Sequence, residues 1–212
     1  MKRDENQLIP VPQQSRSRET LEQLIEAGMR LLRQRPWDEI GINDIASAAN
    51  RSVGVFYQRF GSREDYLTVL LMRWTENGQR RSEELLAEIA GPAVLEAFLF
   101  DTFRNISENR NLWRAALLRA MSDRSQWEPM RQMGAARMAR VFERIETALG
   151  EPLDAEHRRD IQFAVQLFNS AINNAVLNDP GPLHVEDADF FDRLIAVFRT
   201  VAGERFAKAC GR

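Results

Sequence analysis

The sequence predicts an all-α protein. Apolar residues recur every three or four positions along most of the 212 residues, which is the period of an amphipathic helix. The breaks fall at turn-forming groups such as Gly91-Pro92 and Gly150-Glu151-Pro152. No segment combines alternating hydrophobicity with the turn spacing that a series of strands requires.

The composition is that of a soluble globular protein. Apolar residues make up 44% of the chain and charged residues 28%. The net charge of -2 gives no overall attraction to nucleic acid, although residues 1–63 carry ten basic and eight acidic side chains. The single cysteine, Cys210, cannot form an internal disulfide, and no signal peptide is evident. We therefore expect a cytoplasmic protein.

The helical pattern predicts three parts. Residues 1–15, which include Pro10 and Pro12, are expected to form a flexible arm, residues 16–70 a small helical domain, and residues 71–212 a larger one. The helices are expected over residues 16–33, 42–48 and 53–59, in a long segment from about residue 62, and over 92–105, 111–121, 127–149, 155–178 and 188–208.

Residues 45–60 have the pattern of two helices joined by a tight turn. Ile45 and Ala49 are spaced to face a common core. Asn50 stands where the chain must turn, and asparagine adopts the left-handed conformation more readily than most residues. Ser52 follows as a candidate helix cap, because its hydroxyl can accept a bond from a free backbone N–H.

The second of these helices has one apolar side and one free side. Phe56 and Phe60 are four residues apart and supply the buried side. The remaining side chains point elsewhere, as a reader of the DNA major groove requires: Val53, Val55, Tyr57 and Arg59. Residues 45–63 contain no aspartate or glutamate, so a polyanion meets no carboxylate there.

This segment resembles the DNA-binding domain of the TetR family of transcription regulators. The resemblance covers residues 16–70 and is most specific at three motifs. These are Asp44-Ile45-Ala46, the run from Ala49 through Ser52-x-Gly54-x-x-Tyr57-x-x-Phe60, and Ser62-Arg63-Glu64. The resemblance implies that residues 53–59 form the recognition helix and that Tyr57 and Arg63 contact the DNA backbone. The residues predicted to contact DNA are Asn43, Arg51, Ser52, Val53, Gly54, Val55, Tyr57, Arg59 and Arg63.

Three positions depart from the family pattern. The family usually has glycine at Asn50, valine at Arg51 and threonine at Gly41. The first and last are mild changes. An arginine in place of a buried valine must extend outward to water, where it can add a phosphate contact.

The larger domain offers a flexible apolar set that is either plain core or the lining of an effector cavity. Methionine-rich linings adapt to varied apolar ligands, and family members commonly enclose an effector in this part. The residues predicted to line the cavity are Phe103, Trp113, Leu117, Met121, Trp127, Met130, Gln166, Asn169 and Asn173.

A stripe of amide side chains crosses the otherwise apolar segment 161–177. Gln162, Gln166, Asn169 and Asn173 recur at helical spacing, and buried amides need hydrogen-bond partners. They face either the effector or a dimer seam, and we slightly favour the seam. The resemblance implies that this helix and the last one pack against a second copy as a four-helix bundle. The predicted contacts are Phe168, Ile172, Phe191, Leu194 and Phe198.

Catalytic and metal chemistry find no support in the sequence. His157 and His184 have no further ligands at metal-binding spacing, and no nucleophile elbow, phosphate loop or dinucleotide fingerprint occurs. We expect no metal, cofactor or enzymatic activity. The expected function is that of a repressor that binds a palindromic operator in double-stranded DNA as a homodimer and is released by a small-molecule effector. The alternative is a helical ligand-binding or interaction protein with a degenerate DNA-binding head.

Overall fold

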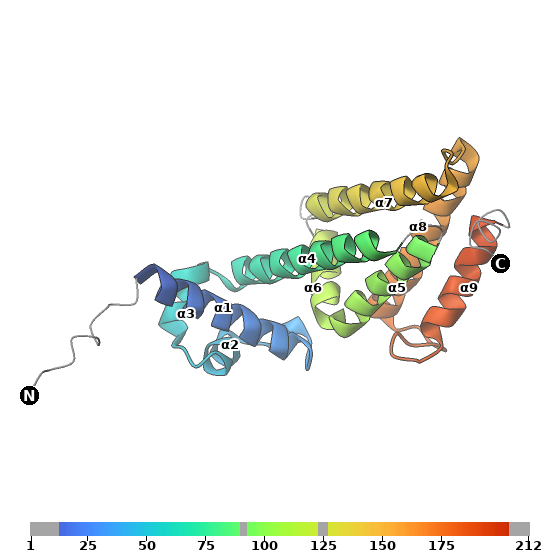
Figure 1. Ribbon diagram of the computed structural model, residues 1–212. Helices are drawn as coiled ribbons and strands as arrows, with labels where there is room; N and C mark the ends of the chain where they lie inside the picture. The colour runs from blue at the N-terminus through green and yellow to red at the C-terminus, as the bar shows by residue number, and fades with distance from the viewer. Residues whose placement is uncertain (1–12, 90–92, 123–126, 204–212) are drawn as a thin grey trace, which may run out of the picture. The chain divides into compact units, whose positions relative to one another are not determined.

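The computed structural model describes residues 13–89, 93–122 and 127–203, and helices make up most of these segments (Figure 1). The described residues contain no strand, so the predicted all-α class is confirmed. The chain divides into two compact units, residues 1–72 and 73–212. None of the described helices is long and apolar enough to span a bilayer.

The first unit, which we call the head, is built from short helices. Its elements are α1 (Gln13–Leu32), the 3-10 turn η2 (Trp37–Glu39), α2 (Ile42–Ala48), α3 (Val53–Phe60) and the beginning of α4 (Arg63–Glu88). Phe56, Phe60 and Tyr66 contact one another as a ring cluster, with centroids 4.7 to 5.2 Å apart. These aromatic rings join α3 to α4 and give the head its core.

Helix α1 approaches the ring cluster at a glycine. A Cβ atom on Gly28 would lie 2.0 Å from the Tyr66 hydroxyl oxygen, which is far closer than any packed carbon tolerates. The Tyr66 hydroxyl donates a hydrogen bond to the Leu24 carbonyl oxygen at 2.6 Å. Burial raises the pKa of this phenol, so it remains a donor. The missing side chain of Gly28 therefore allows α1 and α4 to pack closely.

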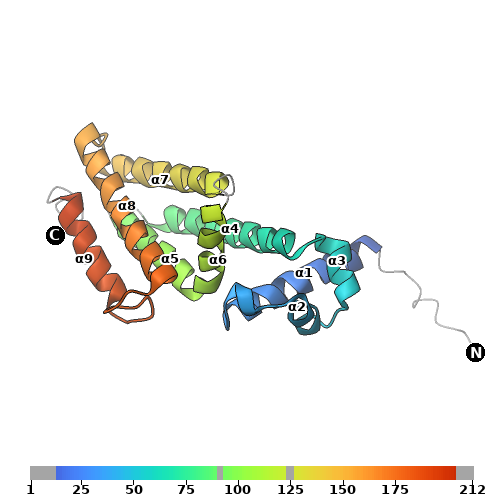
Figure 2. The ribbon, with the colours of Figure 1, turned by 180° about the vertical axis from the view of Figure 1, so that it is seen from behind.

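The second unit contains the remainder of α4 and five further helices (Figure 2). These are α5 (Ala93–Glu108), α6 (Arg110–Ser122), α7 (Glu128–Leu149), α8 (Ala155–Asn178) and α9 (Phe190–Ala202). Helices α8 and α9 pack along each other, while α5 contacts α6, α7 and α9, and α6 contacts α8. An ion pair between Arg199 and Glu96, at 2.7 Å, also joins α9 to α5.

The helix boundaries differ from the predicted ones in a few places. Helix α1 begins three residues earlier than expected, and the 3-10 turn at residues 37–39 was not predicted. Helix α9 spans a shorter range than the predicted 188–208, of which residues 204–208 lie outside the described chain. Most of the predicted arm (residues 1–12) and Cys210 also lie outside it.

Candidate nucleic-acid interface

The turn between α2 and α3 has the geometry that the sequence predicts. Asn50 adopts a left-handed conformation with φ of 53°. The Arg51 N–H donates to the Ala46 carbonyl oxygen at 2.8 Å, which closes the end of α2. The Ser52 hydroxyl oxygen accepts a hydrogen bond from the Val55 N–H at 3.3 Å, which caps α3. The direction of α3 is therefore fixed by local bonds.

The start of α2 is closed by a carboxylate. Asp44 accepts a hydrogen bond from the Gly41 N–H at 2.8 Å and pairs with Arg35 at 3.2 Å. The bond from Gly41, followed by the one from Arg35, lowers the pKa of the Asp44 carboxyl. The Arg30 guanidinium donates to the Ala48 carbonyl oxygen at 2.7 Å and so ties α1 to the end of α2.

Helix α3 buries one side and exposes the other. Phe56 is fully buried and Phe60 nearly so, whereas Tyr57 is 51% exposed. Gln58 is also exposed, although it is absent from the predicted contact residues. Its place follows from the helical period once Phe56 and Phe60 are assigned to the core. The other predicted contacts on this surface are exposed or half-exposed: Asn43, Arg51, Ser52, Val53, Gly54, Val55 and Arg59.

Two of the arginines on this surface are held by single polar side chains of α1. Arg59 donates to the Ser17 hydroxyl oxygen at 2.8 Å. Arg51 extends to the surface, as expected, and donates to the amide oxygen of Gln23 at 3.1 Å through Nε. Exposed bonds of this kind contribute little, so both guanidinium groups can exchange them for phosphate oxygens.

Arg63 has an internal role that the sequence did not predict. Its Nε donates to the Ile40 carbonyl oxygen at 3.0 Å, and a terminal nitrogen donates to the Trp37 carbonyl oxygen. The guanidinium also lies over the Trp37 ring, 4.0 Å from its centroid. Arg63 therefore fastens the η2 segment to α4, and its contact with DNA stays a prediction.

The residues predicted to form an effector cavity separate into several environments. Trp113 donates to the side-chain oxygen of Asn173 at 2.9 Å, and its ring lies 5.4 Å from that of Trp127, so these three come together. Phe103 instead packs on Phe190 and Phe191, with centroids 5.8 and 5.4 Å away. Leu117 is buried, Met130 and Asn169 are half-buried, and Met121 and Gln166 are exposed.

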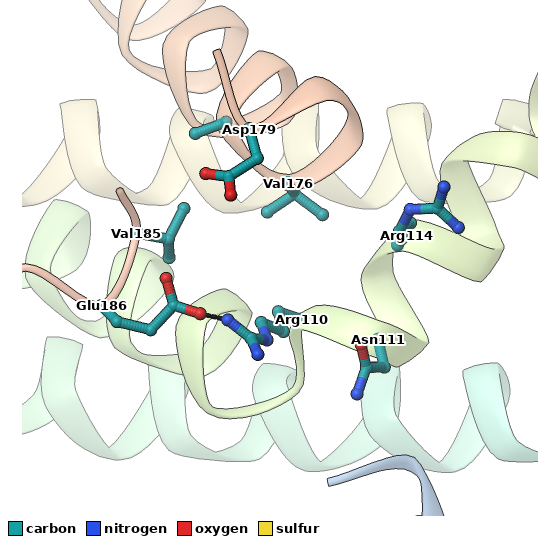
Figure 3. A pocket seen from close by; sticks show the side chains of 8 residues that line it. Arg110, Asn111, Arg114, Val176, Asp179, Val185 and Glu186 are labelled. Atoms are coloured by element: carbon teal, nitrogen blue, oxygen red, sulfur yellow. Dashed lines mark ion pairs between the residues drawn. The ribbon is translucent and has the colours of Figure 1, made fainter. Parts of the chain in front are cut away.

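One pocket of the second unit lies where the sequence did not place one (Figure 3). It has a volume of about 220 Å³, and none of the predicted cavity residues lines it. Its walls come from α6, the end of α8 and the loop before α9: Arg110, Asn111, Arg114, Ala175, Val176, Asp179, Val185 and Glu186. Arg110 and Glu186 form an ion pair across it, and Val176 and Val185 supply apolar surface.

The residues predicted to form dimer contacts differ in exposure within a single chain. Phe168, Ile172 and Phe198 are at most 2% exposed, because α8 and α9 bury them in the core of a single chain. Phe191 and Leu194 are half-buried. The large apolar residues that α8 and α9 do expose are Phe163, Leu167 and Val197.

The amide stripe of α8 divides between two sides. Gln162 and Gln166 are exposed beside Phe163 and Leu167, whereas Asn173 bonds inward to Trp113. The first two therefore lie on the outer side of α8, and the last faces the interior of the unit.

The two histidines stand apart from any metal-like cluster. Each one pairs with a single aspartate, His157 with Asp154 and His184 with Asp179, both at 2.5 Å. Across the described ranges no group of three potential metal-ligating side chains occurs.

Comparison with known proteins identifies the head. Residues 24–68 match the family model of the bacterial regulatory proteins of the tetR family. The uncharacterised HTH-type transcriptional regulator YwcC of Bacillus subtilis is 44% identical over 52 residues, which span 24% of this chain and 23% of that protein. The match thus covers about a quarter of the length of this curated relative.

Solved structures resemble the chain over most of its length. A TetR-family regulator from Streptomyces coelicolor aligns with a TM-score of 0.58 and 18% identity, covering 90% of this chain and 89% of that one. A TetR regulator from Rhodococcus sp. RHA1 aligns with a TM-score of 0.52 and 15% identity, covering 88% and 97%. At sequence identities this low, the structural likeness shows a shared fold and nothing more.

The geometry of α2 and α3 is that of a helix-turn-helix, the motif that places its second helix in the DNA major groove. Through the match over residues 24–68, the head is similar to the DNA-binding domain of the TetR family of transcription regulators.

Proposed function

We propose that the protein is a ligand-responsive repressor that binds a palindromic operator as a homodimer. The observation that carries the proposal is the free surface of α3, where Tyr57, Gln58 and Arg59 are exposed. No carboxylate occurs between residues 45 and 63, so this surface can enter the major groove without repelling phosphates.

An intact head favours this function over the rival of a degenerate one. The left-handed Asn50, the Ser52 cap and the buried Phe56 together fix the angle at which α3 leaves α2. A head that had lost DNA binding would gain nothing from keeping both this turn and the acid-free surface.

The homodimer is supported by the exposed apolar residues of α8 and α9. Phe163 is 52% exposed and Val197 56%, and exposed large apolar side chains on neighbouring helices are typical of an interface. A second copy is the natural partner, because two-fold symmetry presents two α3 helices to two half-sites about 34 Å apart or a multiple of that.

Selection of binding sites from random double-stranded DNA tests the DNA-binding proposal. We expect enrichment of a palindrome, and Tyr57→Phe should weaken binding to all enriched sequences alike because a phosphate contact reads no base. Val55→Ser should change the enriched sequence, since its methyl groups can meet thymine methyls. Failure to enrich any sequence would favour the rival function.

Analytical ultracentrifugation tests the dimer. Val197→Glu should convert a dimer into monomers, because a carboxylate cannot be buried unpaired in an apolar seam. The matched control is Ala139→Glu, which adds the same charge at an exposed position on α7 and should leave the dimer intact. A dimer that survives Val197→Glu and Phe163→Glu would place the interface elsewhere.

A further inference from the structure

In the second unit, charged side chains from three helices gather around a buried carboxylate. Asp101 of α5 is 5% exposed. Arg104, one turn further along α5, donates to Asp101 Oδ1 at 3.0 Å. Arg81 of α4 lies 3.6 Å from the same oxygen. Arg137 of α7 lies over the Phe98 ring, 5.0 Å from its centroid.

Several polar atoms of these residues and of their neighbours in the chain are buried without a hydrogen-bond partner among the described residues. They are Arg81 Nε and Nη2, Ser82 Oγ, Asp101 Oδ2, Thr102 Oγ1 and Arg137 Nε. The separation of 3.6 Å between Arg81 and Asp101 is too long for a hydrogen bond. Although about a third of the Arg81 side chain is exposed, these two nitrogens are closed to solvent. Each such atom carries a desolvation cost that no hydrogen bond within the described chain offsets.

The unpartnered groups are mainly donors, and the cluster has an excess of positive charge. Arg81, Arg104 and Arg137 face the single carboxylate of Asp101, and Arg104 takes one of its oxygens. Burial lowers the pKa of Arg137, an effect that Asp101 opposes and Arg81 reinforces. A group with negative charge and several acceptor oxygens would satisfy these donors at once.

We propose that the effector of this protein is an oxyanion, whose carboxylate or phosphate group binds Arg81 and Arg137 between α4, α5 and α7. The inference rests on the ligand response in the proposed function and names the chemistry that elicits it.

Anion binding at these donors would involve α4 directly, because Arg81 lies on that helix. Because the unpartnered atoms are closed to solvent, an anion reaches them by parting the helices around them. Arg81 and Ser82 lie on α4, which begins at Arg63 in the head. An anion bound there therefore acts on the helix that also anchors the η2 segment, and it shifts the DNA affinity by its differential binding to the two states.

Thermal unfolding of the full chain, followed with four probes, tests the proposal. Inorganic phosphate and benzoate supply an oxyanion in free and organic form, benzamide supplies the same ring without charge, and sodium chloride matches the ionic strength. We expect phosphate or benzoate to raise Tm by about 5 °C or more at a hundredfold excess over Kd, and benzamide and chloride to leave it unchanged. A response to phosphate alone identifies a free oxyanion, and a response to benzoate an organic acid.

Two variants separate a ligand site from a structural ion cluster. Arg137→Met removes a buried cation but keeps an apolar stem, so it should raise the Tm of the free protein and weaken the responding anion about tenfold or more. Arg81→Met should weaken the anion similarly. Arg131→Gln, at an exposed arginine of the same helix α7 whose ion pair with Glu128 lies within that helix, is the matched control and should change neither quantity.

The outcomes decide between the inferences. The oxyanion site is overturned if neither phosphate nor benzoate changes Tm. It is also overturned if Arg137→Met lowers the Tm of the free protein and leaves the anion response unchanged. Operator binding is measured in parallel on the same proteins without anion. Operator binding without an anion response leaves the DNA-binding proposal standing, and an anion response without operator binding overturns that proposal alone.

Discussion

The two units treat their polar groups in opposite ways. In the head, the buried Tyr66 hydroxyl finds the Leu24 carbonyl oxygen, and the half-buried Arg63 finds two carbonyls and a ring. Within the described residues, every buried side-chain atom that lacks a hydrogen-bond partner lies in the second unit, on α4, α5 or α7. Among the described residues, the buried polar side chains of the head are therefore hydrogen-bonded, whereas the second unit contains buried polar atoms without such bonds.

The largest effect should come from Gly28→Ala in the head. The added methyl group would overlap the Tyr66 hydroxyl, so the ring must move and its bond to Leu24 is lost. We expect the free energy of unfolding to fall by about 3 kcal/mol, as overpacking and a lost buried hydrogen bond combine. Chemical denaturation measures this change.

Gly134→Ala is the matched control in the second unit. Gly134 lies in α7, and a Cβ atom added to it would have no neighbour within 4 Å. Alanine there should therefore stabilise the protein by up to about 1 kcal/mol through helix propensity. Equal effects of the two substitutions would show that α1 and α4 do not pack closely at Gly28.

The head could be predicted from the sequence because its determinants are local. Asn50, Ser52 and Phe56 act within a few residues of each other, and spacing alone gives the turn, the cap and the buried side. The carbonyl partners of Arg63 could not be predicted, since they lie in η2 and just after it, more than 20 residues earlier in the chain. Helical periodicity reveals no such contact.

The second unit was harder to predict because its helices have more than one apolar side. On α8, Phe168 and Ile172 face the core while Phe163 and Leu167 face outward, and periodicity does not say which side meets a partner. The arginines around Asp101 come from α4, α5 and α7, which only the tertiary packing brings together. Its arginines have no distinguishing spacing in the sequence.

Arg59 and Arg63 differ in how the head holds them: Arg59 has one exposed hydrogen bond, whereas Arg63 donates to two backbone carbonyl oxygens. Arg59→Ala should lower the salt slope of operator binding by about one and leave thermal stability unchanged, because its bond to Ser17 is exposed. Arg63→Ala should lower the salt slope similarly and also destabilise the head by about 1 to 2 kcal/mol, through loss of its bonds to Trp37 and Ile40. An unchanged slope for Arg63→Ala would leave that residue with the anchoring role alone.

Two exposed carboxylates close helix starts, one in each unit, and they should give the smallest effect. Asp154 caps α8 by accepting from the His157 N–H at 2.9 Å, and the backbone and side-chain bonds from His157 lower the pKa of its carboxyl. In the head, the bonds from Gly41 and Arg35 lower the pKa of the Asp44 carboxyl in the same way. A carboxyl whose pKa is lower in the folded state stabilises the fold above its unfolded pKa of about 4, and this contribution is lost as the pH falls through the folded value.

Asp154→Asn and Asp44→Asn should therefore each flatten the acid side of the stability profile slightly, which chemical denaturation at a series of pH values measures. Because the units are separate compact bodies, we expect amide hydrogen exchange to respond mainly in α8 for the first variant and in α2 for the second. Equal acid sensitivity of both variants and the parent protein would remove these caps from the pH dependence of either unit.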